Sequence, residues 1–170
     1  MNIKKIKLNK KGEGAVSMSF GWIFSLILIL FFIFTAIYGI KAFLNMKSCT
    51  QVGAFYDSLQ NKVGEAYRSS SSDFEMEVNV PGISQICFAN LTERVTGPNS
   101  AYEELSMYAV YAANTFLLPT QKACDMPYKT IKYLNLSKTT QVKNPLCFDV
   151  SNGNTIRIVK GYYEKGVTIK

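Results

Sequence analysis

The chain has 170 residues, a formal net charge of +7 and no histidine. Histidine is the commonest general base near neutral pH and a member of most catalytic triads, and the chain also lacks a P-loop or dinucleotide-binding glycine motif. Length and composition therefore argue against an enzyme and predict no cofactor.

The basic charge is concentrated at the start of the chain. Residues 1–14 contain five lysines and one acidic residue, Glu13, whereas 14 basic and 11 acidic residues are spread over the segment from Lys41 onward. Short lysine-rich flanks of a membrane span stay cytoplasmic. We therefore expect a cytoplasmic basic leader over residues 1–14 that contacts membrane lipid, and no nucleic-acid partner.

A long apolar run follows the leader. No charged side chain lies between Glu13 and Lys41, and residues 22–40 are almost continuously apolar. About 20 such residues cross a hydrocarbon core of about 30 Å as a helix. The pattern predicts a transmembrane helix over residues 15–40, in which the hydroxyls of Ser17, Ser19, Ser25 and Thr35 bond to carbonyls of their own helix.

The helix is expected to continue beyond the membrane. Apolar residues at spacings of three and four draw one stripe over residues 49–67, opposite a polar face. The stripe comprises Cys49, Val52, Phe55, Tyr56, Leu59, Val63, Ala66 and Tyr67. Residues 41–68 are therefore predicted to be an amphipathic extension of the same helix, which ends at the serine run 69–72.

The remaining segment, residues 74–170, is predicted to be β-rich. Strict alternation over residues 74–80 indicates a half-buried strand, and Pro81–Gly82 predicts a turn that returns residues 83–89 as its hairpin partner. Ser100 and Glu103 form a capping-box pattern ahead of a helix near 101–113, although 106–112 can also be interpreted as a strand.

Further strands are predicted toward the C-terminus. Residues 114–118 form a strand closed by Pro119, and a strand within 128–136 is an open alternative to a loop. Residues 146–150 and 155–160 are typical of a hairpin, and residues 167–170 of a final edge strand. The expected fold class is α+β, with a long N-terminal transmembrane helix that continues into an ectodomain containing an antiparallel β-sheet.

All four cysteines lie in the segment expected outside the cytoplasm: Cys49, Cys87, Cys124 and Cys147. Without histidine or a C-x-x-C pair, a metal site would need four remote thiolates, so no metal is expected. The cysteines can then be either disulfide-bonded or buried as free thiols. An even number outside a reducing cytosol favours two disulfides. We favour Cys87 with Cys147, two similar strand positions, and Cys49 with Cys124, which ties the helix to the segment 120–143.

Two N-glycosylation patterns, at Asn90 and Asn135, are usable only if this domain is translocated. The carboxylate pairs at 75 and 77 and at 103 and 104 are better explained by solvation and by a helix N-terminus than by catalysis. Several tyrosines, Tyr102, Tyr108, Tyr111, Tyr162 and Tyr163, fit either packing or a carbohydrate or protein contact surface.

Lysines, then Lys11-Gly-Glu-Gly-Ala-Val16, then an apolar helix resemble the class III signal peptide of archaeal type IV pilin-like proteins. The resemblance covers about the first 45 residues. It implies cleavage by a prepilin-type peptidase after Gly14, within Glu13-Gly14-Ala15-Val16, or after Gly12 as a second site. Many pilins carry a glutamate five residues into the mature helix, where this chain has Ser19 or Ser17.

The resemblance implies a single-pass surface subunit that self-assembles through its N-terminal helix, with the N-terminus cytoplasmic and the C-terminal domain extracytoplasmic. An uncleaved signal-anchored surface binding protein, or an accessory subunit of a membrane complex, is the alternative.

Overall fold

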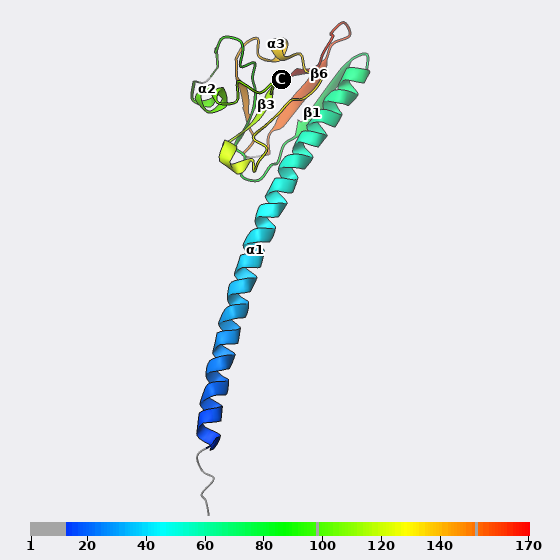
Figure 1. Ribbon diagram of the computed structural model, residues 1–170. Helices are drawn as coiled ribbons and strands as arrows, with labels where there is room; N and C mark the ends of the chain where they lie inside the picture. The colour runs from blue at the N-terminus through cyan, green and yellow to red at the C-terminus, as the bar shows by residue number, and fades with distance from the viewer. Residues whose placement is uncertain (1–12, 98, 152) are drawn as a thin grey trace, which may run out of the picture. The chain divides into compact units, whose positions relative to one another are not determined.

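A computed structural model describes residues 13–97, 99–151 and 153–170, shown in Figure 1. The chain divides into two units, Met1–Asn45 and Met46–Lys170. The described part of the first unit is helical and belongs to α1 (Glu13–Arg68), whose C-terminal turns belong to the second unit. The expected α+β fold, a long apolar N-terminal helix followed by antiparallel sheets, is confirmed.

The second unit contains two antiparallel sheets and short helical segments. The first sheet has the order β1-β6-β7 and the second β4-β3-β2-β5. The remaining elements are β1 (Ser72–Glu77), β2 (Gln85–Phe88), α2 (Asn99–Ser106), β3 (Thr115–Leu118), the 3-10 helix η1 (Thr120–Lys122), β4 (Tyr128–Lys129), α3 (Leu136–Thr139), β5 (Leu146–Asp149), β6 (Thr155–Lys160) and β7 (Thr168–Ile169).

The main core lies between the C-terminal turns of α1 and the two sheets. Val52, Leu59 and Val63 of α1 are fully buried and belong to one cluster with residues of both sheets, such as Ile156 and Ile86. The predicted apolar stripe is therefore the packing face of this part of α1. Its last aromatic residue, Tyr67, is an exception because its side chain is 39% exposed.

A second cluster covers the other face of the β2–β3 pair. Cys87 and Phe116 pack there with Ala101 and Leu105 of α2, whereas Ile86 and Leu117 point into the main core. Both faces of this sheet are covered, which explains why β3 is a continuous buried run rather than an alternating one.

The alternation predicted over residues 74–80 is confirmed, since Met76, Val78 and Val80 are buried and the residues between them are exposed. The strand itself begins earlier and ends earlier than predicted, because β1 spans Ser72–Glu77 and residues 78–80 lie beyond it. The hairpin prediction is wrong. β1 pairs with β6, whereas β2 pairs with β3 and β5 in the other sheet. The Pro81–Gly82 turn does form, with Ile83 N donating to Val80 O at 3.1 Å. A turn reverses the chain without deciding which strands pair, and here it leads from one sheet to the other.

The second predicted hairpin is also wrong, because β5 is an edge strand of one sheet and β6 is the centre of the other. This connection runs beside the first one: Val78 N donates to Asn154 O at 3.1 Å, and Val150 N donates to Ser84 O at 2.8 Å. The chain therefore changes sheets twice at adjacent places.

The helix predicted near 101–113 is shorter and begins earlier, at Asn99, and the alternative strand over 106–112 is absent. After Ser106 the chain continues in overlapping turns, with Tyr108 N donating to Leu105 O and Tyr111 N donating to Tyr108 O. These turns bring Tyr108 and Tyr111 against Tyr128, with ring centroids 5.1 and 4.8 Å away, so aromatic packing overrides the helical pattern.

The predicted strand at 114–118 corresponds to β3, and the possible strand within 128–136 is reduced to the two residues of β4. The final edge strand is β7, at the margin of the first sheet.

Candidate functional site

The first unit presents apolar side chains on every side of its helix. Large apolar residues from Phe20 to Leu44 are exposed at nearly every position, as shown by Leu30 at 65% and Phe34 at 74%. Among the described residues, this is the one helix that is long and apolar enough to cross a membrane, judged by length and composition. A helix that is apolar all round requires a cover of lipid or of other helices.

One polar side chain of the apolar segment, Thr35, forms hydrogen bonds within its own helix. The Thr35 hydroxyl lies 3.0 Å from the carbonyl oxygens of both Phe31 and Phe32, the back-bonding that the sequence predicts. A threonine that bonds within its own helix is compatible with an apolar surrounding.

The proposed processing residues lie at the edge of the described chain. Gly12 is outside the described residues, and α1 begins at Glu13, so Gly14 and Ala15 lie in its first turn. Their side-chain surroundings are also outside the description. Cleavage after Gly14 or Gly12 therefore stays a prediction.

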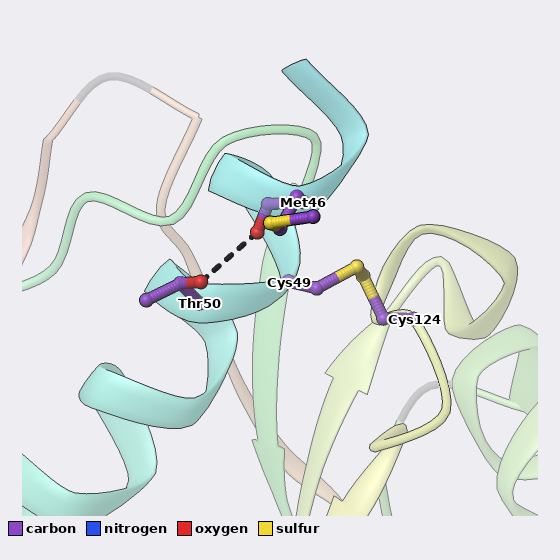
Figure 2. The surroundings of a disulfide bond; sticks show 4 residues. All are labelled: Met46, Cys49, Thr50 and Cys124. Carbon is purple, nitrogen blue, oxygen red and sulfur yellow. Dashed lines mark hydrogen bonds between the residues drawn. A yellow bond between two sulfur atoms is a disulfide. The ribbon is translucent and has the colours of Figure 1, made fainter. Parts of the chain in front are cut away.

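A disulfide joins α1 to the loop after η1 in the second unit (Figure 2). Cys49 and Cys124 are 75 residues apart in sequence and their Cα atoms are 5.6 Å apart. The same loop accepts a hydrogen bond from the buried Tyr56 hydroxyl at Met126 O, 3.2 Å away, and burial raises the pKa of that hydroxyl. Closing a loop of this length stabilises a fold by roughly 4 kcal/mol in the chain-entropy model.

The second disulfide crosses the sheet between opposed positions of β2 and β5. Cys87 and Cys147 are register partners with Cα atoms 4.0 Å apart. The two pairs are those that the sequence favours, and no described cysteine is free. Two disulfides are typical of an oxidising compartment outside the cytoplasm.

The two glycosylation candidates lie in different local structures. Asn90 is half-buried in a loop, where its side-chain oxygen accepts from the Thr92 hydroxyl at 2.8 Å. Asn135 is the N-cap of α3 and accepts from Lys138 N at 3.1 Å. Glycosylation of Asn90 and of Asn135 therefore stays a prediction.

The acidic residues occupy structural positions. Glu75 and Glu77 are exposed on β1, as the alternation predicts. Glu104 accepts from the backbone N–H and the hydroxyl of Thr120, both at 2.8 Å, and so caps η1. Within the described residues no group of three His, Cys, Asp or Glu side chains is placed to hold a metal ion.

Exposed ion pairs connect distant parts of the second unit. The Arg157 guanidinium, hydrogen-bonded to Asp73, lowers the pKa of that carboxyl below its usual range. Lys138 similarly lowers the pKa of Glu164. Both pairs are exposed to solvent, so they contribute little stability.

Sequence reasoning missed an aromatic feature on the surface of the second unit. The rings of Tyr67 and Tyr133 are stacked with centroids 4.2 Å apart and planes 13° apart. A hollow of about 280 Å³ and another of about 340 Å³ both have this pair in their walls. The apolar spacing of α1 predicts Tyr67 on the packing face, but no local pattern pairs it with Tyr133, 66 positions later.

Four of the five tyrosines singled out in the sequence fall into two groups, and the fifth, Tyr102, is half-buried on α2. Tyr108 and Tyr111 pack with Tyr128, and burial, followed by the effect of Tyr111, raises the pKa of Tyr128. Tyr162 and Tyr163 contact each other at the turn between β6 and β7 and are 70% and 94% exposed. Packing explains the first group but not the second.

No protein-family model matches this chain, and neither a curated protein nor a solved structure shows significant similarity to it. The fold and the chemistry of the sites are therefore the basis of any functional assignment.

Proposed function

We propose that this protein is a pilin-like structural subunit of the cell surface, anchored by one transmembrane helix before assembly. The observation that supports this function best is the change of environment along α1. Its residues 20–44 expose apolar side chains all round, whereas Val52 to Ala66 bury a single stripe in the second unit. Such a subunit needs a helix that leaves lipid and packs against copies of itself.

The charge pattern and the disulfides support the orientation. Five lysines precede the apolar segment, which favours a cytoplasmic N-terminus. Both disulfides lie after it, and disulfides persist in oxidising surroundings. The proposed subunit therefore has its second unit, Met46–Lys170, outside the cytoplasm.

The test is N-terminal mass spectrometry of the mature full-length chain from an archaeal host that has a class III signal peptidase. We expect a mature protein that begins at Ala15, or at Glu13 if the second site is used. Gly14→Val blocks the first cut, and Gly12→Val is the matched control that leaves it in place. A mature protein with its lysine-rich leader intact contradicts the pilin-like function.

The alternative is an uncleaved, signal-anchored surface protein that binds a partner, or an accessory subunit of a membrane complex. Ser19 or Ser17, where many pilins have a glutamate, favours this alternative because an assembly contact is then missing. An intact leader together with a protease-accessible second unit supports it.

A further inference from the structure

We propose that the two hollows beside the Tyr67–Tyr133 stack form a binding site for an acidic polysaccharide with one carboxylate per few sugar units. The first hollow is lined by Gln60, Asn61, Gly64, Tyr67, Arg68 and Tyr133, and the second by Tyr67, Tyr133, Leu134, Asn135, Lys165 and Gly166. All of these residues belong to the second unit, Met46–Lys170. The inference goes beyond the structural function and does not depend on cleavage of the leader.

The backbone of Tyr133 is strained at this point. Its φ is +70°, a conformation that bulky residues rarely adopt and that glycine or asparagine fills readily. Val167 holds it there, because Val167 N donates to Tyr133 O at 2.8 Å and Asn135 N donates to Val167 O at 2.7 Å. The strained conformation places a ring that is 50% exposed over Tyr67. Strain that yields a half-exposed aromatic ring, rather than a buried one, points to a role in binding.

The charges around the stack are positive. Arg68 lines the first hollow and Lys165 the second, and both are exposed. Among the described residues that line the two hollows, none is acidic. The nearby carboxylates of Glu65 and Glu164 are paired with Lys62 and Lys138. One cation in each hollow suits a ligand with widely spaced negative charges.

The amides add hydrogen-bond donors. The Gln60 side-chain oxygen accepts from Lys132 N at 2.9 Å, and the Asn135 oxygen accepts from Lys138 N at 3.1 Å. Because these oxygens are used, both side chains present their NH₂ groups, which suit the hydroxyl, ring and carboxylate oxygens of a sugar. Tyrosine rings in turn offer apolar area to the C–H faces of sugar rings.

The surface continues toward the turn that holds Tyr162 and Tyr163. The end of β6 is paired with the start of β1, and Lys160 Nζ lies 2.6 Å from Ser69 O and 5.8 Å from the Tyr67 ring centroid. Figure 1 shows this turn beyond β6 beside the end of α1. Two adjacent hollows with an exposed aromatic turn nearby fit several successive units of a chain better than one small molecule.

The test measures binding of a fluorescent hyaluronan oligosaccharide, which carries one carboxylate on every second sugar unit, to the full-length protein in detergent micelles. We expect saturable binding that weakens at least tenfold in Tyr133→Asn and in the double variant Arg68→Gln/Lys165→Gln. Tyr133→Asn removes the ring while asparagine tolerates the backbone conformation, so this variant is expected to fold. Tyr133→Phe keeps the stack and is expected to bind like the wild type.

Tyr111→Ala is the matched control, because Tyr111 is also 50% exposed but packs against Tyr128 instead of the Tyr67–Tyr133 stack. It is expected to leave binding unchanged. Equal binding by wild type and Tyr133→Asn, or no binding of the hyaluronan oligosaccharide, overturns the proposal. Equal binding of neutral dextran contradicts the proposal that the ligand is acidic. Binding of single-stranded DNA in place of the oligosaccharide assigns the surface to nucleic acid instead.

Discussion

Asn144 organises the loop that follows β2. Its side-chain oxygen accepts from Asn90 N at 3.0 Å and its NH₂ group donates to Asn90 O at 2.7 Å. The side-chain amide therefore satisfies both backbone groups of Asn90, as the backbone of a neighbouring strand would. Its own carbonyl oxygen accepts from Thr96 N and Gly97 N, both at 3.0 Å. The backbone at residue 97 is therefore pressed against the segment before β5.

Gly97→Ala is expected to destabilise the second unit by about 1 to 3 kcal/mol, the usual cost of overpacking. A β-carbon at this position lies 2.3 Å from the Pro145 carbonyl oxygen, so the two backbone segments have to separate. The measurement is urea-dependent pulse proteolysis of the full-length chain in detergent.

Gly64→Ala is the matched control, because nothing lies within 4 Å of a β-carbon at that position of α1. Alanine is favoured over glycine within a helix by about 1 kcal/mol, so this variant is expected to be at least as stable as the wild type. A Gly97→Ala variant as stable as Gly64→Ala contradicts the close contact.

The helix α1 has two kinds of surface, and the boundary follows its residue pattern. Large apolar residues occur at consecutive positions up to Leu44, whereas residues 52–66 place them three and four apart. The first pattern leaves no polar face and the second leaves one that carries exposed Asp57 and Asn61. One element therefore combines an apolar segment with the packing helix of a globular unit.

Leu59→Ala is expected to destabilise the second unit by about 2 to 5 kcal/mol, because Leu59 is fully buried in the main core and its truncation leaves a cavity. Leu30→Ala removes the same atoms from a side chain that is 65% exposed in the first unit. It is expected to leave the unfolding midpoint of the second unit unchanged. Equal midpoints for the two variants by pulse proteolysis of the full-length chain would refute the difference in packing.

Along the whole chain, the lysine-rich leader and the disulfide-forming cysteines lie on opposite sides of the apolar segment. All five leader lysines precede it, and Cys49, Cys87, Cys124 and Cys147 follow it. Because lysines near a span favour the cytoplasmic side, the charge pattern and the disulfides support the same orientation.

Replacing the five leader lysines with glutamine is expected to leave part of the molecules inverted, with the second unit inside the cell and its cysteines reduced. Replacement with arginine keeps the charge and is expected to preserve the wild-type orientation. Protease treatment of intact cells followed by non-reducing electrophoresis measures both properties. Full protease accessibility of the glutamine variant would show that the leader does not orient the chain.

Local patterns predict individual elements of this fold well. The stripe from Val52 to Ala66, the alternation through Met76 and Val78 and the short run of β3 all correspond to observed elements. The periods of 3.6 and 2 residues follow from backbone geometry, so they can be read over a few residues. The favoured cysteine pairs also agree with the structure, since Cys87 and Cys147 lie in strands of similar pattern.

Strand pairing and the aromatic surface are not predictable in this way. Both proposed hairpins join neighbours in sequence, but β1 and β6 meet across 77 intervening residues. Tyr133 is placed over Tyr67 by a backbone conformation that its own sequence context disfavours. Such features depend on which distant segments pack together.

The residues alone thus predict the apolar helix, its amphipathic continuation, the α+β class and the charge asymmetry, because each depends on local composition or period. Tertiary structure decided that β1 and β2 belong to different sheets, that both faces of the β2–β3 pair are covered, and that the Tyr67–Tyr133 stack lies between two hollows. The physical reason is that burial of apolar surface stabilises many arrangements of the same elements. Which arrangement is the most stable depends on contacts between segments that are distant in sequence.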